Sequence, residues 1–216
     1  MKKVAVLLDG GVVLRRLYQM LERRHAEAAD VFRFGMSCAL PQEEEVFRLY
    51  YYDCPPYEES GQNPLDPDSK IDFSRKAITR RRRSLQQKLS LMSHVAFRRG
   101  GLFPQGWRLR ETALRHIAAE PRHLDAADLE PDFEQKRVDI KIGLDVAWPA
   151  SKQIVDRVVL VTGDTGFVPA LTFARREGTQ VVLVPIGRQG QGRSLRARGF
   201  RARRSISSSR DSGCLA

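Results

Sequence analysis

Two short, uninterrupted apolar runs near the end of the chain constrain the fold most strongly. They are Arg157–Thr162 (RVVLVT) and Gln180–Pro185 (QVVLVP), and Phe167, Leu171 and Ala174 mark a helical pattern between them. Continuous runs rich in β-branched residues are typical of strands buried on both faces, and two such strands joined through a helix form a βαβ unit. The sequence therefore predicts an α/β fold with a central, mainly parallel sheet.

Further elements precede this unit. The apolar run Val4–Leu8 predicts a buried strand followed by a helix, and Val46–Asp53 (VFRLYYYD) predicts a second strand. Residues 58–69 are expected to form a loop, because glycine, proline and polar residues are frequent there. The remaining expectations are a helix from about Phe73, a strand at Val95–Phe97, a hairpin around Trp107, a short helix near Thr112–Ala119, and a helix over Val138–Trp148 with Ile140, Leu144 and Ala147 on one face.

Length and composition narrow the class of protein. The chain has 216 residues, of which 42% are hydrophobic and 29% charged, as in an ordinary globular protein of one domain with insertions. No apolar run reaches the roughly 18 residues that a transmembrane helix needs, and the run at Val4–Leu8 is too short for a signal peptide. Three cysteines without a C-x-x-C pair support neither a disulfide framework nor a zinc site. We therefore expect a cytoplasmic protein without membrane partners.

Positive charge is concentrated in two segments. Residues 75–88 carry seven basic side chains and no acid, and residues 186–216 carry eight arginines and one acid. The rest of the chain holds a net charge of −3 out of a total of +11. Segregated positive charge is typical of proteins that bind nucleic acids, although a solvated helix face and a disordered tail would give the same pattern.

Aspartates follow two of the predicted strands directly. Asp9 ends the first strand and Asp164 follows the strand at Arg157–Thr162, so both are expected at the carboxyl edge of the sheet, where ligands collect in folds of this class. Asp139 begins a predicted helix and can reach the same edge. Asp145 lies six residues further on, a rotation of roughly 600°, so the two acids do not share a helix face.

Clustered carboxylates repel one another unless a cation lies among them, and oxygen ligands suit Mg²⁺ or Mn²⁺. Such a metal ion can polarise a phosphoryl oxygen and activate water. Each aspartate also has a structural interpretation, as a helix cap or as a first-turn acid favoured by the helix dipole. The conjunction of two aspartates at strand ends favours a site.

Several motifs together resemble the NYN domain family, and in particular its LabA-like branch within the PIN-like nucleases. The matching segments are VAVLLDGG (residues 4–11), RLYYYDCPPYE (48–58), IDFSRKA (71–77), HVAFRRGGL (94–102), QKRVDIKIGLD (135–145) and VVLVTGDTGFVPAL (158–171). The resemblance implies a PIN-like, Rossmann-like three-layer α/β/α sandwich over residues 1–186, with insertions at about 55–70 and 100–134. Residues 187–216 are then an Arg/Gly/Ser-rich tail that we expect to be flexible.

The resemblance also implies a function. It points to a metal-dependent endoribonuclease that acts on RNA, single-stranded in the first instance, with Mg²⁺ or Mn²⁺ as the cofactor. The catalytic acids are then Asp9, Asp139 and Asp164, and Asp145 matches a further family acid that would complete the metal ligands. The expected contacts with nucleic acid are Arg80, Arg81, Arg83, Lys141 and Thr162. A homodimer remains open as an assembly.

One departure from the family pattern supports a second candidate function. The family carries another aspartate two residues after its Gly-Asp pair, and this chain has Gly166 there. The alternative is therefore a catalytically weak or inactive RNA-binding module of the same fold. A phosphohydrolase of the haloacid-dehalogenase kind is disfavoured, because that mechanism needs an aspartate two residues after its nucleophile and Gly11 occupies that position after Asp9.

Overall fold

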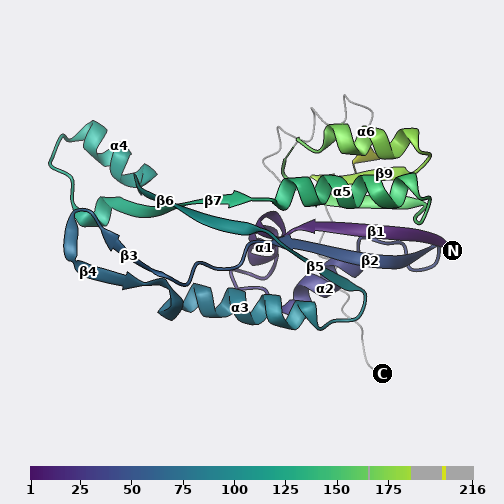
Figure 1. The fold of residues 1–216 in the computed structure, drawn as a ribbon, viewed down its shortest axis with the longest axis horizontal. Helices are drawn as coiled ribbons and strands as arrows, with labels where there is room; N and C mark the ends of the chain where they lie inside the picture. The colour runs from purple at the N-terminus through teal and green to yellow at the C-terminus, as the bar shows by residue number, and fades with distance from the viewer. Residues whose placement is uncertain (165, 186–200, 203–216) are drawn as a thin grey trace, which may run out of the picture. The chain divides into compact units, whose positions relative to one another are not determined.

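A computed structural model describes residues 1–164, 166–185 and 201–202 of the chain (Figure 1). The strands, in chain order, are β1 (Lys2–Asp9), β2 (Glu44–Asp53), β3 (Ser60–Asn63), β4 (Asp66–Asp72), β5 (Val95–Arg99), β6 (Gly101–Leu109), β7 (Leu129–Lys136), β8 (Arg157–Thr162), β9 (Gln180–Pro185) and β10 (Arg201–Ala202). The helices are α1 (Gly10–Met20), α2 (Ala28–Met36), α3 (Ala77–Ser90), α4 (Glu111–Ala119), α5 (Val138–Ser151) and α6 (Val168–Arg176), with short 3-10 turns at Phe73–Arg75 and Ala126–Asp128. The described residues divide into two compact units.

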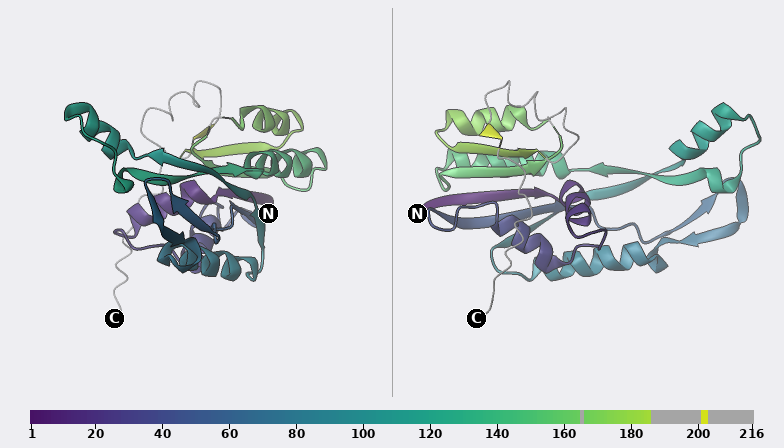
Figure 2. Two further views of the ribbon diagram at one scale, coloured as in Figure 1. Left: turned by 60° about the vertical axis from the view of Figure 1, so that its left-hand side comes forward. Right: turned by 180° about the vertical axis from the view of Figure 1, so that it is seen from behind.

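The first unit comprises residues 1–53, 88–98 and those from 139 onward. Its sheet has the strand order β10-β9-β8-β1-β2-β5, and the pairs β1–β2, β1–β8, β8–β9 and β9–β10 are all parallel. The connections β1-α1-α2-β2 and β8-α6-β9 run in opposite directions along the sheet, so right-handed crossovers place their helices on opposite faces. Helices α5 and α6 lie side by side on the face opposite to α1 and α2 (Figures 1 and 2). This confirms the predicted three-layer α/β/α arrangement.

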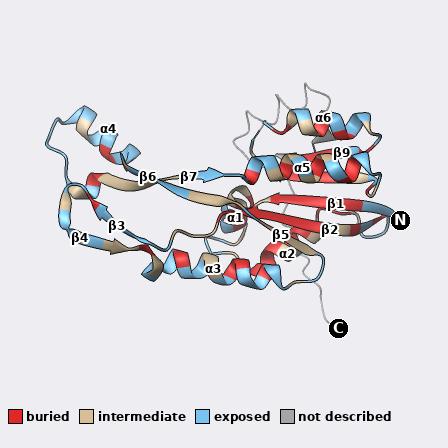
Figure 3. Cartoon of the chain, in the orientation of Figure 1, coloured by how far each residue is buried: buried red, intermediate tan, exposed pale blue. Residues whose placement is uncertain are grey.

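The core lies in the middle strands of this sheet. Residues Val4–Leu8 and Val158–Val161 are completely buried, as Figure 3 shows in red for β1. These runs lack alternation because helices cover both faces of the sheet. The two strands pair in parallel, with Leu8 of β1 opposite Val161 of β8.

The second unit comprises residues 54–87 and 99–138. It contains two antiparallel ribbons, β3–β4 and β6–β7, together with α4 and most of α3. Tyr57, Phe73 and Phe133 pack together, with ring centroids 5.0 to 5.8 Å apart. Gly61 lets β3 approach this cluster, since a Cβ there would meet Phe73 Cε2 at 2.8 Å.

The structure corrects three expectations. Residues 58–69 are not a loop, because they hold β3 and the start of β4, whose exposed polar residues carry no alternating pattern. The prediction of a hairpin around Trp107 is also wrong. Trp107 lies inside β6 opposite Pro131 of β7, and α4 lies between the two strands in the chain.

The third correction concerns α5, which buries a different face from the one expected. Its fully or largely buried residues include Val138, Ile142 and Val146, whereas Ile140 and Leu144 are 66% and 61% exposed. Trp148 is exposed as well. Helix α5 is apolar around most of its circumference, so periodicity alone could not distinguish the packed face. Figure 3 shows buried and exposed stripes along it.

No helix among the described residues combines the length and the apolarity that a membrane-spanning segment requires. The predicted tail, residues 187–216, lies outside the described residues apart from Arg201 and Ala202.

Candidate active site

Asp9 stands at the carboxyl end of β1, a central strand of the sheet. It caps helix α1, and its Oδ1 accepts hydrogen bonds from the amides of Gly11 at 3.1 Å and Val12 at 3.4 Å. The anticipated cap is therefore present. These two bonds leave the carboxylate at the sheet edge with its orientation set by backbone atoms.

Gly10 holds this turn against the neighbouring strand. A Cβ on Gly10 would lie 2.5 Å from the carbonyl oxygen of Tyr52 and 2.8 Å from Oη of Tyr51. Only glycine allows that approach, because backbone atoms cannot move aside as a flexible side chain can. The position of Asp9 is thus determined by close packing between the start of α1 and the end of β2.

Thr162 links Asp9 to the next strand. It ends β8, beside β1 in the sheet, and is 1% exposed. Its hydroxyl donates to Asp9 Oδ2 at 3.3 Å and accepts from the amide of Asp164 at 3.1 Å. The structure therefore brings Asp9 and the Asp164 turn together through one hydroxyl.

Asp164 itself is exposed, and its Oδ1 accepts from the amide of Gly166 at 2.9 Å. A Cβ on Gly166 would meet the Asp164 carboxylate oxygens at 3.5 Å, an ordinary van der Waals distance. The backbone at Gly166 consequently has room for a side chain, and an aspartate there would lie beside Asp164.

Burial raises the pKa of the Asp9 carboxyl above its ordinary value, and the charge of Asp139 raises it further. The hydrogen bonds from Val12, Thr162 and Gly11 act in the opposite direction. Asp139 lies in the first turn of α5 and is exposed. Asp9 is therefore a carboxylate whose ionised form is costly in this environment, and a bound cation would offset that cost.

Asp145 has different surroundings. The guanidinium of Arg98 donates to both of its carboxylate oxygens, at 2.8 and 2.7 Å, and Tyr52 Oη donates to Oδ2 at 2.9 Å. Burial, together with the charge of Asp145, raises the pKa of Tyr52 well above its ordinary value, so the phenol stays a donor. Arg98 also lies over the ring of Tyr50, 5.3 Å from its centroid.

Among the described residues, no three histidine, cysteine, aspartate or glutamate side chains gather as a ready metal-binding group. The candidate metal ligands that the structure brings near one another are the carboxylates of Asp9 and Asp139. Mg²⁺ is commonly held by one or two carboxylates and several waters, so this oxygen-only set fits a hard cation. It does not fit zinc, which prefers nitrogen and sulfur ligands.

The predicted nucleic-acid contacts differ in their surroundings. Arg80 and Arg81 are exposed on α3, whereas Arg83 forms an ion pair with Glu58, Nη2 to Oε1 at 2.7 Å. Lys141 is half-buried on α5, and Thr162 is buried with its hydroxyl bound to Asp9. Arg80 and Arg81 are therefore the members of this set that present charge to solvent.

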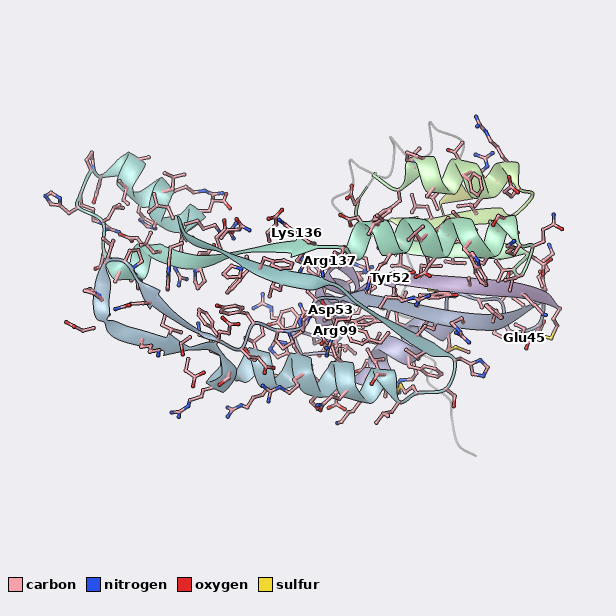
Figure 4. All side chains as sticks on the ribbon, in the orientation of Figure 1. Glu45, Tyr52, Asp53, Arg99, Lys136 and Arg137 are labelled. Carbon is pink, nitrogen blue, oxygen red and sulfur yellow. The ribbon has the colours of Figure 1, made fainter. Side chains whose placement is uncertain are left out.

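Sequence reasoning missed the roles of Tyr52 and Arg98. Both lie in segments that resemble the family, yet neither segment indicates that the two side chains share one carboxylate partner. The three consecutive tyrosines at 50–52 are all buried, and their rings belong to the core (Figure 4 labels Tyr52 and Asp53). None of the three offers a surface for stacking on nucleic-acid bases.

Comparison with known proteins decides the family. The family model of the NYN domain matches residues 70–201, more than half of the chain. The chain belongs to the NYN domain family. This membership supports the nuclease-type, PIN-like fold expected from the sequence motifs.

No curated protein matches this NYN-domain protein. Among solved structures it is similar to a protein of unknown function from Vibrio parahaemolyticus, with 17% sequence identity and a TM-score of 0.43. That similarity covers 87% of this chain and 85% of the other.

Proposed function

We propose that this NYN-domain protein, as a member of the LabA-like branch, is a metal-dependent endoribonuclease that hydrolyses phosphodiester bonds in single-stranded RNA. One observation carries the proposal. Asp9 is a partly buried carboxylate at the end of a central strand, held by three hydrogen bonds, and both burial and Asp139 raise its pKa. A carboxylate with a pKa raised in this way is a candidate functional group, and a bound cation would offset the cost of ionising it.

In this proposal Asp9 and Asp139 hold Mg²⁺ or Mn²⁺, and Asp164 contributes from the adjacent turn. The metal ion supplies Lewis-acid polarisation of a phosphoryl oxygen and lowers the pKa of water. Thr162 is a positioning residue, because its hydroxyl orients Asp9 Oδ2 and fixes the amide of Asp164. Asp145 is the further metal ligand of the proposal, and Arg98 and Tyr52 orient its carboxylate.

The exposed basic residues of α3 bind the phosphate groups of RNA in this proposal. Arg80 and Arg81 are exposed, and guanidinium groups bind phosphate oxygens without reading the base sequence. We therefore expect affinity that falls steeply as salt concentration rises.

The second candidate function is an RNA-binding module without catalysis. Gly166 favours it, because the position where the family carries another aspartate has no carboxylate here. The absence of a three-carboxylate group among the described residues points the same way.

Cleavage of a labelled single-stranded RNA tests the two candidates. The reactions contain Mg²⁺, Mn²⁺ or EDTA, and the proteins are wild type, Asp9→Asn and the double variant Asp9→Asn, Asp164→Asn. Asp156→Asn is the matched control, because Asp156 lies at the opposite edge of the same sheet, where its carboxylate accepts from the amide of Lys3 at 2.7 Å. The nuclease proposal expects metal-dependent cleavage by wild type and Asp156→Asn only.

Binding without cleavage by the wild type would support the module instead. In that case Gly166→Asp is the informative variant, since the backbone has room for the added side chain. Cleavage that persists in the double variant would contradict the site assignment.

A further inference from the structure

The ribbon β6–β7 of the second unit carries an exposed aromatic side chain with two cations close to it. Phe103 of β6 is 37% exposed. Lys136 Nζ and the guanidinium carbon of Arg137 each lie 5.7 Å from its ring centroid. All three residues lie within residues 99–138, and Figure 4 labels the two cations. The predicted nucleic-acid contacts include none of them.

The ring of Phe103 packs against Gly101 of the same strand. A Cβ added to Gly101 would meet Phe103 Cε2 at 2.6 Å, so the ring occupies the space that a side chain at residue 101 would fill. Residues two apart on a strand share a face, which places the Phe103 ring against the backbone of Gly101. The ring therefore lies over the backbone of its own strand.

The two cations are not equivalent. Lys136 forms an ion pair with Glu134, Nζ to Oε2 at 3.0 Å, and Gln105 donates to the same oxygen at 2.9 Å. Arg137 has no carboxylate partner within the part of the chain that the structure describes. The three charged groups around Phe103, Lys136, Arg137 and Glu134, therefore leave a net charge of +1, located on Arg137.

Arg137 is also conformationally unusual. Its φ is +71°, in the left-handed region that residues other than glycine rarely adopt. In this conformation the guanidinium approaches the Phe103 ring. Non-glycine residues held in this region are concentrated at ligand-binding and active sites, and this one lies beside an exposed aromatic ring.

We infer that Phe103 and Arg137 form a subsite for one unpaired nucleobase and its adjoining phosphate. The inference rests on the proposed function, since it assumes that the protein binds RNA. The base stacks on Phe103, and the Arg137 guanidinium binds the phosphate. Every base has a π face, so such a subsite accepts any base, and a base within a duplex cannot reach it.

Two matched oligonucleotides separate stacking from charge. The first is a short, fluorescein-labelled oligouridylate, and the second has the same length and phosphates but abasic riboses. Binding to the full chain is measured by fluorescence anisotropy in EDTA, which prevents metal-dependent cleavage. We expect the wild type to bind the base-bearing oligomer about tenfold more tightly, a preference within the range of one stacked base.

Variants assign that preference to Phe103. Phe103→Ala should bind both oligomers with equal affinity, and Phe103→Trp should keep the preference. Leu109→Ala is the matched control, because Leu109 lies on the same strand and is also 37% exposed, and it should behave as the wild type. Arg137→Gly removes the guanidinium in a residue that tolerates positive φ, so it should weaken binding to both oligomers equally.

The outcomes distinguish the two proposals. If Phe103→Ala retains the wild-type preference while RNA is still bound, the subsite is overturned and the proposed function stands. If the wild type binds neither oligomer at low salt, the proposed function is overturned, and the subsite with it.

Discussion

The guanidinium of Arg98 binds both carboxylate oxygens of Asp145, through Nε at 2.8 Å and Nη2 at 2.7 Å. This pair joins β5 to α5, and Tyr52 adds a third hydrogen bond from β2. Two aspartates six residues apart on α5 therefore have different surroundings. Asp139 is exposed and raises the pKa of Asp9, whereas Asp145 is engaged by a cation and a phenol of the protein itself.

Asp145→Asn should destabilise the protein. We expect a loss of about 1–2 kcal/mol in the free energy of unfolding, because the substitution removes a charge-assisted pair that is only partly shielded from water. Urea denaturation measures it. The double variant Arg98→Gln, Asp145→Asn should lose less than the two single variants together, and strict additivity would show that the pair contributes no coupling.

Asp9→Asn should have the opposite effect on stability. The pKa of Asp9 is raised in the folded protein, so its ionised form destabilises the fold at neutral pH, and asparagine caps a helix as well as aspartate does. The variant should be at least as stable as the wild type in EDTA at neutral pH. As the pH falls through the raised pKa toward 3.8, the wild-type carboxyl becomes protonated and the difference should disappear. A variant less stable than the wild type at neutral pH would contradict this interpretation of Asp9.

The same pKa sets a pH dependence for function. Cation binding requires the ionised carboxylate, so metal-dependent cleavage should decrease as the pH falls through the raised pKa of Asp9. Initial cleavage rates at saturating Mg²⁺ and at a tenth of that concentration would show it. The decrease should be larger at the lower concentration, because excess metal competes with the proton. An equal decrease at both concentrations would locate the titrating group elsewhere.

Gly10→Ala should be costly and Gly143→Ala should not. The added methyl group at residue 10 meets the Tyr52 carbonyl at 2.5 Å, which we expect to cost about 1–3 kcal/mol and to displace Asp9. At Gly143, inside α5, a Cβ meets nothing within 4 Å, and alanine should add about 0.5–1 kcal/mol through helix propensity. Thermal denaturation of both variants measures the two effects. A lower melting temperature for Gly10→Ala reports the steric clash, and a higher one for Gly143→Ala reports the gain in helix propensity.

The packed face of α5 can be tested with two leucine-sized residues. Ile142→Ala should cost about 2–5 kcal/mol, because Ile142 is completely buried. Leu144→Ala should change stability by at most about 0.5 kcal/mol, because that side chain is mostly exposed. Equal losses would show that Leu144 is covered in solution, and sedimentation at several concentrations would then reveal whether a second copy covers it.

Much of the fold follows from local sequence. The runs at residues 4–8 and 158–161 predict strands covered on both faces, and such strands with a helix between them imply a parallel α/β sheet. The position of Asp9 at the carboxyl edge follows as well, because a residue that ends a central parallel strand lies at that edge whatever the details of packing.

Other features depend on partners distant in the chain. The pairing of β6 with β7 spans α4, so no local pattern around Trp107 reveals it. The buried face of α5 depends on what packs against a helix that is apolar on most sides. The ion pair of Asp145 depends on Arg98, which lies 47 residues away from Asp145 and meets it only when β5 joins the sheet. The sequence by itself determined the fold class and the chemical nature of the acids at the sheet edge. Tertiary packing decided which of those acids lies beside Asp9. Only the packed chain brings Asp145 to Arg98, and Asp9 to the hydroxyl of Thr162 and to the carboxylate of Asp139.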